Sequence, residues 1–407
     1  MILKNKSYFS CDESQVGRES IDSHWMWRAL GYAYRGCGTT TPNPMVGAVV
    51  VKDGELAGYG WHERAGKEHA EIVALNMAGS SAYGSTVYVT LEPCNHYGRT
   101  SPCTKALIEA GVKKIVIAMR DPNPKVKGQG VVVLQDAGIE VIVGVLEQQA
   151  RELNAGWMYW VTTGKPYIVL KLALSLDGRI ANEVGESKSG GLPWITGRCA
   201  RAVVHKMRRW SDAVMVGANT VCLDNPILTY RNTDYRNVND YLANNANVSE
   251  KILRAQPVKI VIDPNLNTSI DFLVYKASLN EKPVMVMCSS ACSKVKKQEF
   301  RDAGIKVCEV GMNSKGKFDI ALAIDVLGDF GIQSILCEGG ARLGTSLMSA
   351  CLVNRLILFY SARIIGSKGR PSFDTEWMND CEINNKLSLT TVRRIGMDVM
   401  LDYKVSM

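Results

Sequence analysis

The chain has 407 residues, enough for two or three domains at roughly 150 residues each, with a buried core in every one. Hydrophobic residues make up 46% of the chain and charged residues 22%, which excludes a disordered or collagen-like protein. The net charge of +8 arises after residue 150 without long Lys/Arg runs, so it suits phosphorylated small molecules at least as well as a nucleic acid. With no long apolar run and no apolar leader, we expect a cytoplasmic protein.

The first part of the chain predicts an α/β domain. We expect residues 1–20 to form a poorly ordered extension, followed by the domain at residues 21–160. In that domain, apolar runs suited to buried strands alternate with helical patterns, which favours an α/β layer sandwich. The strands are expected at residues 45–51, 85–91 and 114–119, and the helices at residues 70–78 and 104–110.

A second α/β domain is expected at residues 161–407. Gly164 and Pro166 interrupt the pattern before an apolar strand at 167–173, which favours a boundary near residue 160. Further strands are expected at residues 213–216, 258–262, 284–288, 306–310, 334–338 and 355–360. Residues 232–250 are rich in Asn, Asp and Tyr without periodicity, so they predict a long surface loop.

One histidine and two cysteines have the order of a catalytic zinc site. The twelve cysteines, in a chain without a secretion signal, favour reduced thiols or metal ligands over disulfides. His69 opens a predicted helix, Cys94 follows a predicted strand, and Cys103 opens the next helix. Three such ligands leave the fourth tetrahedral position of Zn²⁺ for water, whose pKa the ion lowers to roughly 7. We therefore predict zinc-hydroxide chemistry at this site.

Glu71 is the predicted acid and base of that chemistry. Two residues after His69, it can face the substrate without binding the metal, take a proton from the water and deliver it to a ring nitrogen and the departing amine. This pattern, continued by Pro93-Cys94, is the signature of zinc nucleobase deaminases, although eight residues rather than two separate the cysteines. Two alternatives stay open: unrelated structural roles for these residues, or a structural zinc site with His62 or His96 as fourth ligand.

The surrounding motifs resemble the deaminase half of the bifunctional riboflavin-biosynthesis deaminase-reductases, the RibD/RibG family. The motifs are Thr41-Pro42-Asn43-Pro44-Met45-Val46-Gly47, Gly60-Trp61-His62, His69-Ala70-Glu71, and Thr90-Leu91-Glu92-Pro93-Cys94 through Cys103. The resemblance implies a cytidine-deaminase-like three-layer sandwich. It also implies that a diaminopyrimidinone with a ribosyl phosphate is bound by Asn43, His62, His96, Arg99 and Asn123, with Arg99 on the phosphate.

The second half resembles the reductase of the same family, which is similar in fold to dihydrofolate reductase. The matching stretches are Lys171 through Arg179, Trp194-Ile195-Thr196, and a run from His205 through Arg208, Asp212, Gly217, Thr220 and Asp224 to Arg231. The resemblance places Lys171 among the substrate-holding residues, and we predict that it lies nearest the chemistry. It implies that the substrate is held by Ser187, Arg208, Leu228, Arg231 and Glu338, with the arginines on its phosphate. NADPH would be held by Ala173, Trp194, Thr196, Thr220, Asp224 and a loop of Gly340, Ala341, Arg342, Leu343, Gly344, Thr345 and Ser346.

Three features of this half bear on those assignments. The approach to Trp194 is longer than usual, so either Ser187 or Ser189 could be the substrate-binding serine. Residues 232–250 are an insertion near Arg231. Gly339-Gly340 after an apolar strand favours a phosphate turn at a helix start, but no G-x-G-x-x-G is present, so the NADPH expectation comes from the resemblance.

The resemblance implies a bifunctional enzyme. Its first half would deaminate 2,5-diamino-6-ribosylamino-4(3H)-pyrimidinone 5′-phosphate, and its second half would use NADPH to reduce the ribosyl group of 5-amino-6-(5-phosphoribosylamino)uracil to ribityl. It further implies a homo-oligomer with no nucleic-acid or membrane partner. A tRNA or free-base deaminase would instead need a basic, aromatic surface beside the zinc site. A non-catalytic zinc protein would have lost Glu71, and a chain with only one active half is a further alternative.

Overall fold

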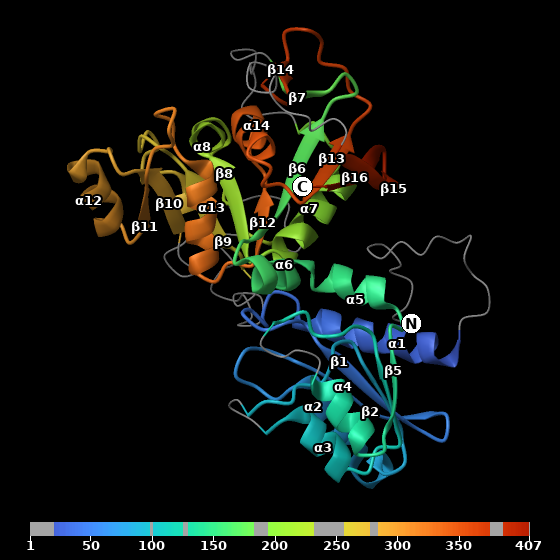
Figure 1. Ribbon diagram of the computed structural model, residues 1–407. Coiled ribbons are helices and arrows are strands. Elements are labelled where there is room, and N and C mark those ends of the chain that lie inside the picture. The colour runs from blue at the N-terminus through green and yellow to red at the C-terminus, as the bar shows by residue number, and fades with distance from the viewer. Residues whose placement is uncertain are drawn as a thin grey trace. The chain divides into compact units, whose positions relative to one another are not determined.

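The computed structural model divides the chain into two compact units, Met1–Gly164 and Lys165–Met407, each built on its own sheet (Figure 1). The structure describes residues 20–97, 101–124, 129–182, 194–231, 256–276, 284–374 and 386–406. Several expectations fall outside these ranges: the extension before residue 20, the loop at 232–250, and the side chains of Arg99, Ser187 and Ser189. Within the described ranges, no helix has the length and apolar character needed to cross a membrane.

The first unit contains a five-stranded sheet in the order β2-β1-β3-β4-β5. Its strands are β1 (Gly47–Lys52), β2 (Glu55–Trp61), β3 (Thr86–Val89), β4 (Lys114–Ile117) and β5 (Glu140–Val143). Its helices are α1 (Ile21–Ala33), α2 (Ala70–Ala78), α3 (Cys103–Glu109), α4 (Gln129–Asp136), α5 (Glu147–Leu153) and α6 (Ala155–Thr163), with 3₁₀ turns η2 (Tyr34–Gly36) and η3 (Gly79–Ala82). β1 is antiparallel to β2 and β3, whereas β3, β4 and β5 run parallel.

Each face of this sheet has its own hydrophobic core, because successive side chains of a strand point to opposite faces. Ala48 and Val50 of β1 belong to the core that the sheet forms with α2, α3 and α4. Val49 and Val51 belong to the core formed with α1, α5 and α6. Helices therefore cover both faces, and the first unit is the expected three-layer sandwich (Figure 1).

Two glycines of β2 allow α2 to lie unusually close to the sheet. A Cβ atom on Gly60 would lie 2.5 Å from the backbone oxygen of Ala70, and one on Gly58 would lie 2.3 Å from that of Ala74. No side chain fits at such distances, so glycine is required at both positions. The close approach sets the position of the first turn of α2, which follows His69 and contains Glu71.

The second unit contains a nine-stranded sheet in the order β11-β10-β9-β8-β12-β6-β13-β16-β15, and β14 pairs with β7 separately. Its strands are β6 (Tyr167–Leu174), β7 (Arg179–Ala181), β8 (Ala213–Gly217), β9 (Val258–Ile262), β10 (Val284–Ser289), β11 (Lys306–Val310), β12 (Ser334–Cys337), β13 (Arg355–Tyr360), β14 (Arg370–Pro371), β15 (Leu387–Ile395) and β16 (Asp398–Val405). Its helices are α7 (Arg198–Trp210), α8 (Ala218–Asp224), α11 (Leu273–Lys276), α12 (Lys294–Asp302), α13 (Ile320–Asp329) and α14 (Ala341–Ser349).

The central strands of this sheet are parallel and buried on both faces. Antiparallel pairing occurs at one edge of this sheet, where β16 pairs with β13 on one side and with β15 on the other. Side chains of α13 and α14 pack in the core on one face, and side chains of α7, α8, α11 and α12 pack in the core on the other. Because the carboxyl ends of parallel strands meet at one edge, residues that follow β8 and β12 lie near each other.

Candidate active sites

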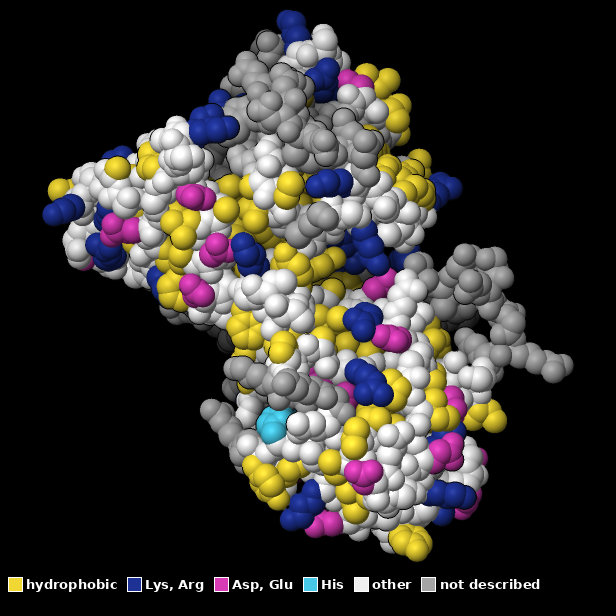
Figure 2. Space-filling view, in the orientation of Figure 1, with side chains coloured by type: hydrophobic (Ala, Val, Ile, Leu, Met, Phe, Trp, Pro, Cys, Tyr) yellow, Lys and Arg dark blue, Asp and Glu magenta, His cyan; other side chains and the backbone are white. Residues whose placement is uncertain are grey.

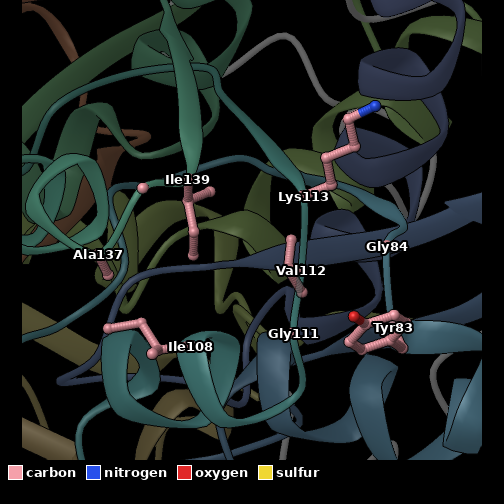
Figure 3. Close-up of a pocket in the computed structure, with 9 residues that line it drawn as sticks. Tyr83, Gly84, Ile108, Gly111, Val112, Lys113, Ala137 and Ile139 are labelled. Atoms are coloured by element: carbon pink, nitrogen blue, oxygen red, sulfur yellow. The ribbon is translucent and has the colours of Figure 1, made fainter.

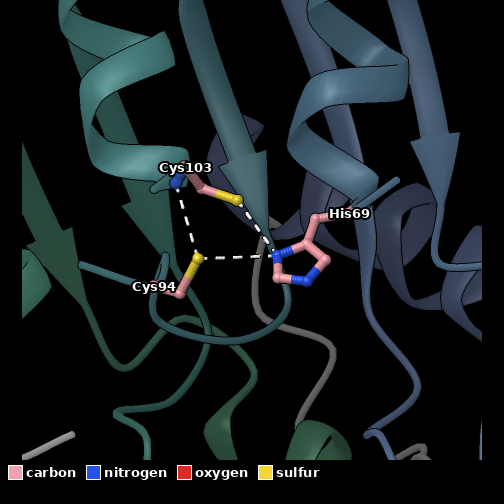
Figure 4. A group of neighbouring side chains, drawn as sticks. All are labelled: His69, Cys94 and Cys103. Carbon is pink, nitrogen blue, oxygen red and sulfur yellow. Dashed lines mark hydrogen bonds between the residues drawn. The ribbon is translucent and has the colours of Figure 1, made fainter. Parts of the chain in front are cut away.

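Three side chains of the first unit form a group that could hold a metal ion. The ligand atoms of His69, Cys94 and Cys103 all lie within 4.8 Å of one another. His69 Nδ1 is 3.2 Å from the Cys103 sulfur and 3.5 Å from the Cys94 sulfur, and the three side chains point toward one another (Figure 4). The structure therefore brings together all three predicted ligands.

Secondary structure positions each member of this group. His69 is the N-cap residue of α2, Cys103 is the first residue of α3, and Cys94 lies in the segment after β3. The backbone N–H of Cys103 donates to the Cys94 sulfur at 3.4 Å. Hydrogen bonding from Cys103 and His69 lowers the pKa of the Cys94 thiol to about 4, despite the opposing effect of burial.

The donor set fits Zn²⁺ with one open coordination position. One imidazole nitrogen and two thiolates suit the ion, and the group holds no fourth His, Cys, Asp or Glu among the described residues. His62 is not a fourth ligand, because its Nε2 contacts the Asn43 amide at 3.0 Å and its Nδ1 contacts the Glu68 carbonyl at 3.1 Å. His96 is exposed. The arrangement therefore favours a catalytic over a structural zinc site.

Glu71 is a buried acid beside this group. Glu71 is only 3% exposed. Burial and the charge of Cys94 together raise the pKa of its carboxyl to about 6. A carboxyl with that pKa can take up and release a proton near neutral pH. Its position on the first turn of α2 places the predicted acid and base next to the predicted ligands.

The expected substrate residues of the first unit are partly brought together. Asn43 and His62 contact each other, and the His62 ring lies edge-on to His69 with ring centres 5.6 Å apart. Burial, and then the neighbouring His69, lowers the pKa of His62. Asn123 lies in a turn where its N–H donates to Asp121 at 2.8 Å.

Glu92 makes long-range hydrogen bonds that the sequence did not predict. Its carboxylate is buried and accepts hydrogen bonds from the backbone N–H groups of Asp121, at 3.2 Å, and Val131, at 3.1 Å. It thereby links the segment before Cys94 to the turn that contains Asn123 and to α4. A carboxylate between Leu91 and Pro93 gives no local signal of these distant partners.

In the second unit, a buried cluster of three charges joins β6, α7 and β12. The carboxylate of Glu338, directly after β12, binds Arg208 Nε at 2.6 Å and Arg208 Nη2 at 3.1 Å. The ammonium of Lys171, on β6, lies 3.3 Å from the same carboxylate. Burial by itself raises the pKa of Glu338, but the charges of Arg208 and Lys171 outweigh it and lower the pKa to about 2.

The expected substrate residues that the structure describes in this unit lie around the cluster, and one of them, Arg208, is already paired within it. The Arg208 guanidinium, expected on the phosphate, is engaged with Glu338 and also donates to the Thr229 carbonyl at 3.0 Å. Leu228 is buried, with a positive φ of 61°. The backbone N–H of Arg231 faces His205 on α7 at 3.3 Å. Four of the five expected substrate residues of this unit thus lie on neighbouring segments, and the fifth, Ser187, lies outside the described residues.

The expected cofactor residues occupy both flanks of the same region. Ala173 is on β6, and Thr220 and Asp224 are on α8. Burial raises the pKa of Asp224, against the charges of Arg370 and Lys171. Thr196 is buried, whereas Trp194 is 70% exposed with Arg201 over its ring at 5.1 Å.

One structural expectation for this region is wrong. The residues expected to form a loop from Gly340 to Ser346 belong to α14 from Ala341 onward, with Gly340 as the N-cap residue. Leu343 and Leu347 recur at helical spacing and pack in the core, which explains why the segment folds as a helix. The N–H groups of its first turn, rather than a flexible loop, are the available anion donors. A Cβ on Gly340 would lie 3.7 Å from the Thr220 hydroxyl, so α14 and α8 begin next to each other.

A shallow pocket at the opposite end of the first sheet is separate from the metal group. Its lining includes Tyr83, Lys113 and Ile139, which precede β3, β4 and β5 (Figure 3). The metal group instead follows the carboxyl end of β3. On the face shown in Figure 2, Lys and Arg side chains are scattered in small groups rather than gathered into one continuous patch.

Two family models match the chain. The model of the cytidine and deoxycytidylate deaminase zinc-binding region matches residues 19–119, which include the whole metal group. The model of the RibD C-terminal domain matches residues 166–401. The chain belongs to the RibD family. The two matches confirm the expected fold class, a cytidine-deaminase-like three-layer sandwich followed by the dihydrofolate-reductase-like reductase domain of this family, and the resemblance from which it was predicted.

RibD proteins match the chain over nearly its whole length. The riboflavin biosynthesis protein RibD of Aquifex aeolicus is 39% identical over 384 residues, or 94% of this chain and 98% of that protein. RibD of Escherichia coli is also 39% identical, over 93% of this chain and 98% of that protein. The solved structure of Acinetobacter baumannii RibD has a TM-score of 0.78 and 36% identity, covering 95% of this chain and 99% of that one.

A solved structure from Thermotoga maritima is described by both activities. It is a diaminohydroxyphosphoribosylaminopyrimidine deaminase/5-amino-6-(5-phosphoribosylamino)uracil reductase with a TM-score of 0.77 and 32% identity. The match covers 95% of this chain and 99% of the Thermotoga maritima chain. The chain is therefore a two-domain RibD of the bifunctional deaminase and reductase type.

Proposed function

We propose that the chain performs two successive steps on a phosphorylated pyrimidine in riboflavin biosynthesis. The first unit deaminates 2,5-diamino-6-ribosylamino-4(3H)-pyrimidinone 5′-phosphate. The second unit reduces the ribosyl group of the resulting 5-amino-6-(5-phosphoribosylamino)uracil to ribityl. The observation that carries the proposal is the group of His69, Cys94 and Cys103 beside a buried Glu71, in a chain of the RibD family.

The residues of the first unit divide the work of deamination. A Zn²⁺ ion held by His69, Cys94 and Cys103 would lower the pKa of a water molecule at its open position and so supply the nucleophile. Glu71 accepts the proton of that water. It would deliver this proton to the ring nitrogen as the water oxygen bonds to the amine-bearing carbon. It would then carry the second proton of that oxygen to the exocyclic amine, whose bond to the carbon breaks to release ammonia as the carbonyl forms. Asn43, His62, His96, Arg99 and Asn123 are proposed to bind the pyrimidine and its phosphate.

The residues of the second unit orient the two reactants of a hydride transfer. NADPH bound here would supply a hydride to C1 of the ribosyl group, while the bond from C1 to the ring oxygen breaks and that oxygen takes up a proton from solvent. Lys171, whose ammonium Glu338 holds in place, is proposed to lie nearest that carbon. Arg231, Leu228 and the Arg208–Glu338 pair form the substrate side, with Ser187 as a further proposed contact. The start of α14 at Gly340, with Thr220 beside it, suits a cofactor phosphate.

One incubation tests both steps. Purified full-length protein of known zinc content is mixed with the diaminopyrimidinone phosphate, and ammonia release and NADPH oxidation are followed together. We expect ammonia with or without NADPH, and NADPH oxidation only after deamination has begun. Ammonia release with no NADPH oxidation, even when the aminouracil is supplied directly, would contradict the reductase assignment. If the zinc-loaded protein releases no ammonia, the deaminase substrate is wrong and single-stranded nucleic acid becomes the next substrate to test.

We also propose that the protein is a homo-oligomer in the cytoplasm. The resemblance favours a homo-oligomer, and the substrates are small soluble metabolites, which suits a cytoplasmic enzyme. Sedimentation of the purified protein measures the assembly directly. The sequence has no long run of Lys and Arg, which favours phosphorylated small molecules over a nucleic-acid partner.

A further inference from the structure

The side chains of Gln256 and Arg208 hold the segment from Leu228 to Arg231 by hydrogen bonds to its backbone. Buried Gln256 exchanges two bonds with Tyr230, donating to its carbonyl at 2.9 Å and accepting from its N–H at 2.8 Å. Arg208 donates to the Thr229 carbonyl at 3.0 Å. Leu228 takes a left-handed conformation that non-glycine residues rarely adopt, so its surroundings must hold it there.

His205 also binds the backbone of this segment. It precedes Arg208 by three residues on α7, a spacing that places both side chains on one face of the helix. Its Nδ1 accepts a hydrogen bond from the backbone N–H of Arg231 at 3.3 Å. A ring that accepts at Nδ1 carries its single proton on Nε2 and has no charge.

The charged groups around His205 keep it neutral. Burial is the largest effect, and the positive charges of Arg208 and Arg231 add to it against the carboxylate of Glu338, so the pKa of His205 falls to about 3. A charged ring would lose its acceptor at Nδ1 and would repel both arginines. The imidazole can therefore keep its bond to Arg231 throughout the physiological pH range.

We propose that His205 is a positioning residue of the reductase: its neutral imidazole fixes the backbone at Arg231 so that Leu228 and Arg231 form a preassembled edge for the phosphorylated substrate. The inference rests on the proposed reductase function. Arg208 is engaged with Glu338, so Arg231 is the arginine left to bind the substrate phosphate. His205 sets the position of Arg231 directly, through the hydrogen bond to its backbone N–H. His205 acts through the backbone, so its loss should weaken binding of the pyrimidine and leave NADPH binding unchanged.

Steady-state kinetics of full-length variants test this role. The probe is 5-amino-6-(5-phosphoribosylamino)uracil, and the variants are His205→Leu, which removes the acceptor, and His205→Asn, whose amide oxygen can replace Nδ1. Loss of one hydrogen bond should raise the KM for the uracil about fivefold to tenfold in His205→Leu, with kcat within about twofold and the KM for NADPH unchanged. His205→Asn should recover most of the loss. His24→Leu, the same change on α1 of the first unit, is the matched control.

Nuclear magnetic resonance provides a readout that is independent of turnover. In the full chain labelled with ¹⁵N-histidine, His205, identified by the signal missing from His205→Asn, should keep an unprotonated Nδ1 from pH 8 to pH 5. A protonated Nδ1 would overturn the inference. An unchanged KM for the uracil in His205→Leu would also overturn it. An equal increase of this KM in both variants, together with a lower melting temperature, would overturn it as well. A wild-type protein that does not oxidise NADPH with the uracil would instead refute the proposed reductase function, and the inference with it.

Discussion

Glu71 and Glu338 are both buried carboxyl groups, and their surroundings give them opposite acid strengths. Glu71 has burial and a neighbouring thiolate, which raise its pKa to about 6. Glu338 is slightly more exposed, with 9% of its side chain accessible, but has Arg208 and Lys171 as partners, which lower its pKa to about 2. One group can therefore exchange protons near neutral pH, and the other stays an anion that holds two cations in place.

Replacing Glu71 with Gln should separate the two activities. Glutamine keeps the size of the side chain but cannot accept the proton, so ammonia release should fall about 10²-fold to 10⁴-fold. Zinc content should be unchanged, because Glu71 is not a predicted ligand, and NADPH oxidation with supplied aminouracil should also be unchanged. Ammonia assays and metal analysis on the same sample measure both. Retained deamination would remove Glu71 from its assigned role.

Glu338 makes the stability of the second unit depend on acid pH. Its folded-state pKa of about 2 lies below the ordinary value of 4.5, so the ionised carboxylate stabilises the fold above pH 4.5, and this stabilisation disappears as the pH falls toward 2. Glu338→Gln leaves two buried cations without their partner and should cost about 3–5 kcal/mol of unfolding free energy at pH 7. The difference from wild type should shrink at pH 3, as measured by urea unfolding at both pH values. A difference independent of pH would contradict the charge argument.

At the scale of elements, the close packing of α2 on β2 links stability to the metal group. In Gly60→Ala, the new methyl group would meet the backbone of Ala70 at 2.5 Å, so α2 must shift. We expect a loss of about 1–3 kcal/mol of unfolding free energy and weaker zinc retention, because His69 caps the shifted helix. Thermal unfolding and zinc content after dialysis measure the two effects.

Gly31→Ala is the matched control for this change. Gly31 lies within α1, and a Cβ there would meet nothing within 4 Å. Alanine favours a helix interior by about 1 kcal/mol over glycine, so the melting temperature should stay the same or rise. Equal destabilisation by both substitutions would show that the contact with α2 is not the cause.

The elements that the sequence predicted best are those with the strongest local signals. The helix at Ala70–Ala78 and the strands at Val258–Ile262 and Lys306–Val310 have the expected bounds, because short apolar runs between breakers define them. β2 escaped prediction because its glycines, which α2 requires, weaken the strand pattern. β15 is an edge strand with many exposed positions, so its apolar pattern is weak.

The residues of the metal group were predictable because their types and spacing alone indicate their chemistry. The supporting residues were not, because they act through long-range contacts with backbone atoms. Glu92 bonds Val131, which is 39 residues away, and Gln256 bonds Tyr230, which is 26 residues away. A single glutamate or glutamine gives no sign of such partners until the fold brings them together.

At the scale of the whole molecule, the two activities should respond separately to metal removal. A chelator such as 1,10-phenanthroline should abolish ammonia release, and added Zn²⁺ should restore it, because the metal group lies entirely within the first unit. NADPH oxidation with supplied aminouracil should continue in the stripped protein. Parallel assays before and after removal measure both. Loss of both activities at once would show that the reductase also depends on the metal.

The single peptide connection at Gly164 and Lys165 has a consequence for the cell. Two enzymes encoded by separate genes can be made in unequal amounts, and the slower step can be relieved by making more of one of them. Here every copy of the deaminating unit is synthesised with one copy of the reducing unit. The two active sites are therefore always made in a ratio of one to one, and gene expression cannot change that ratio.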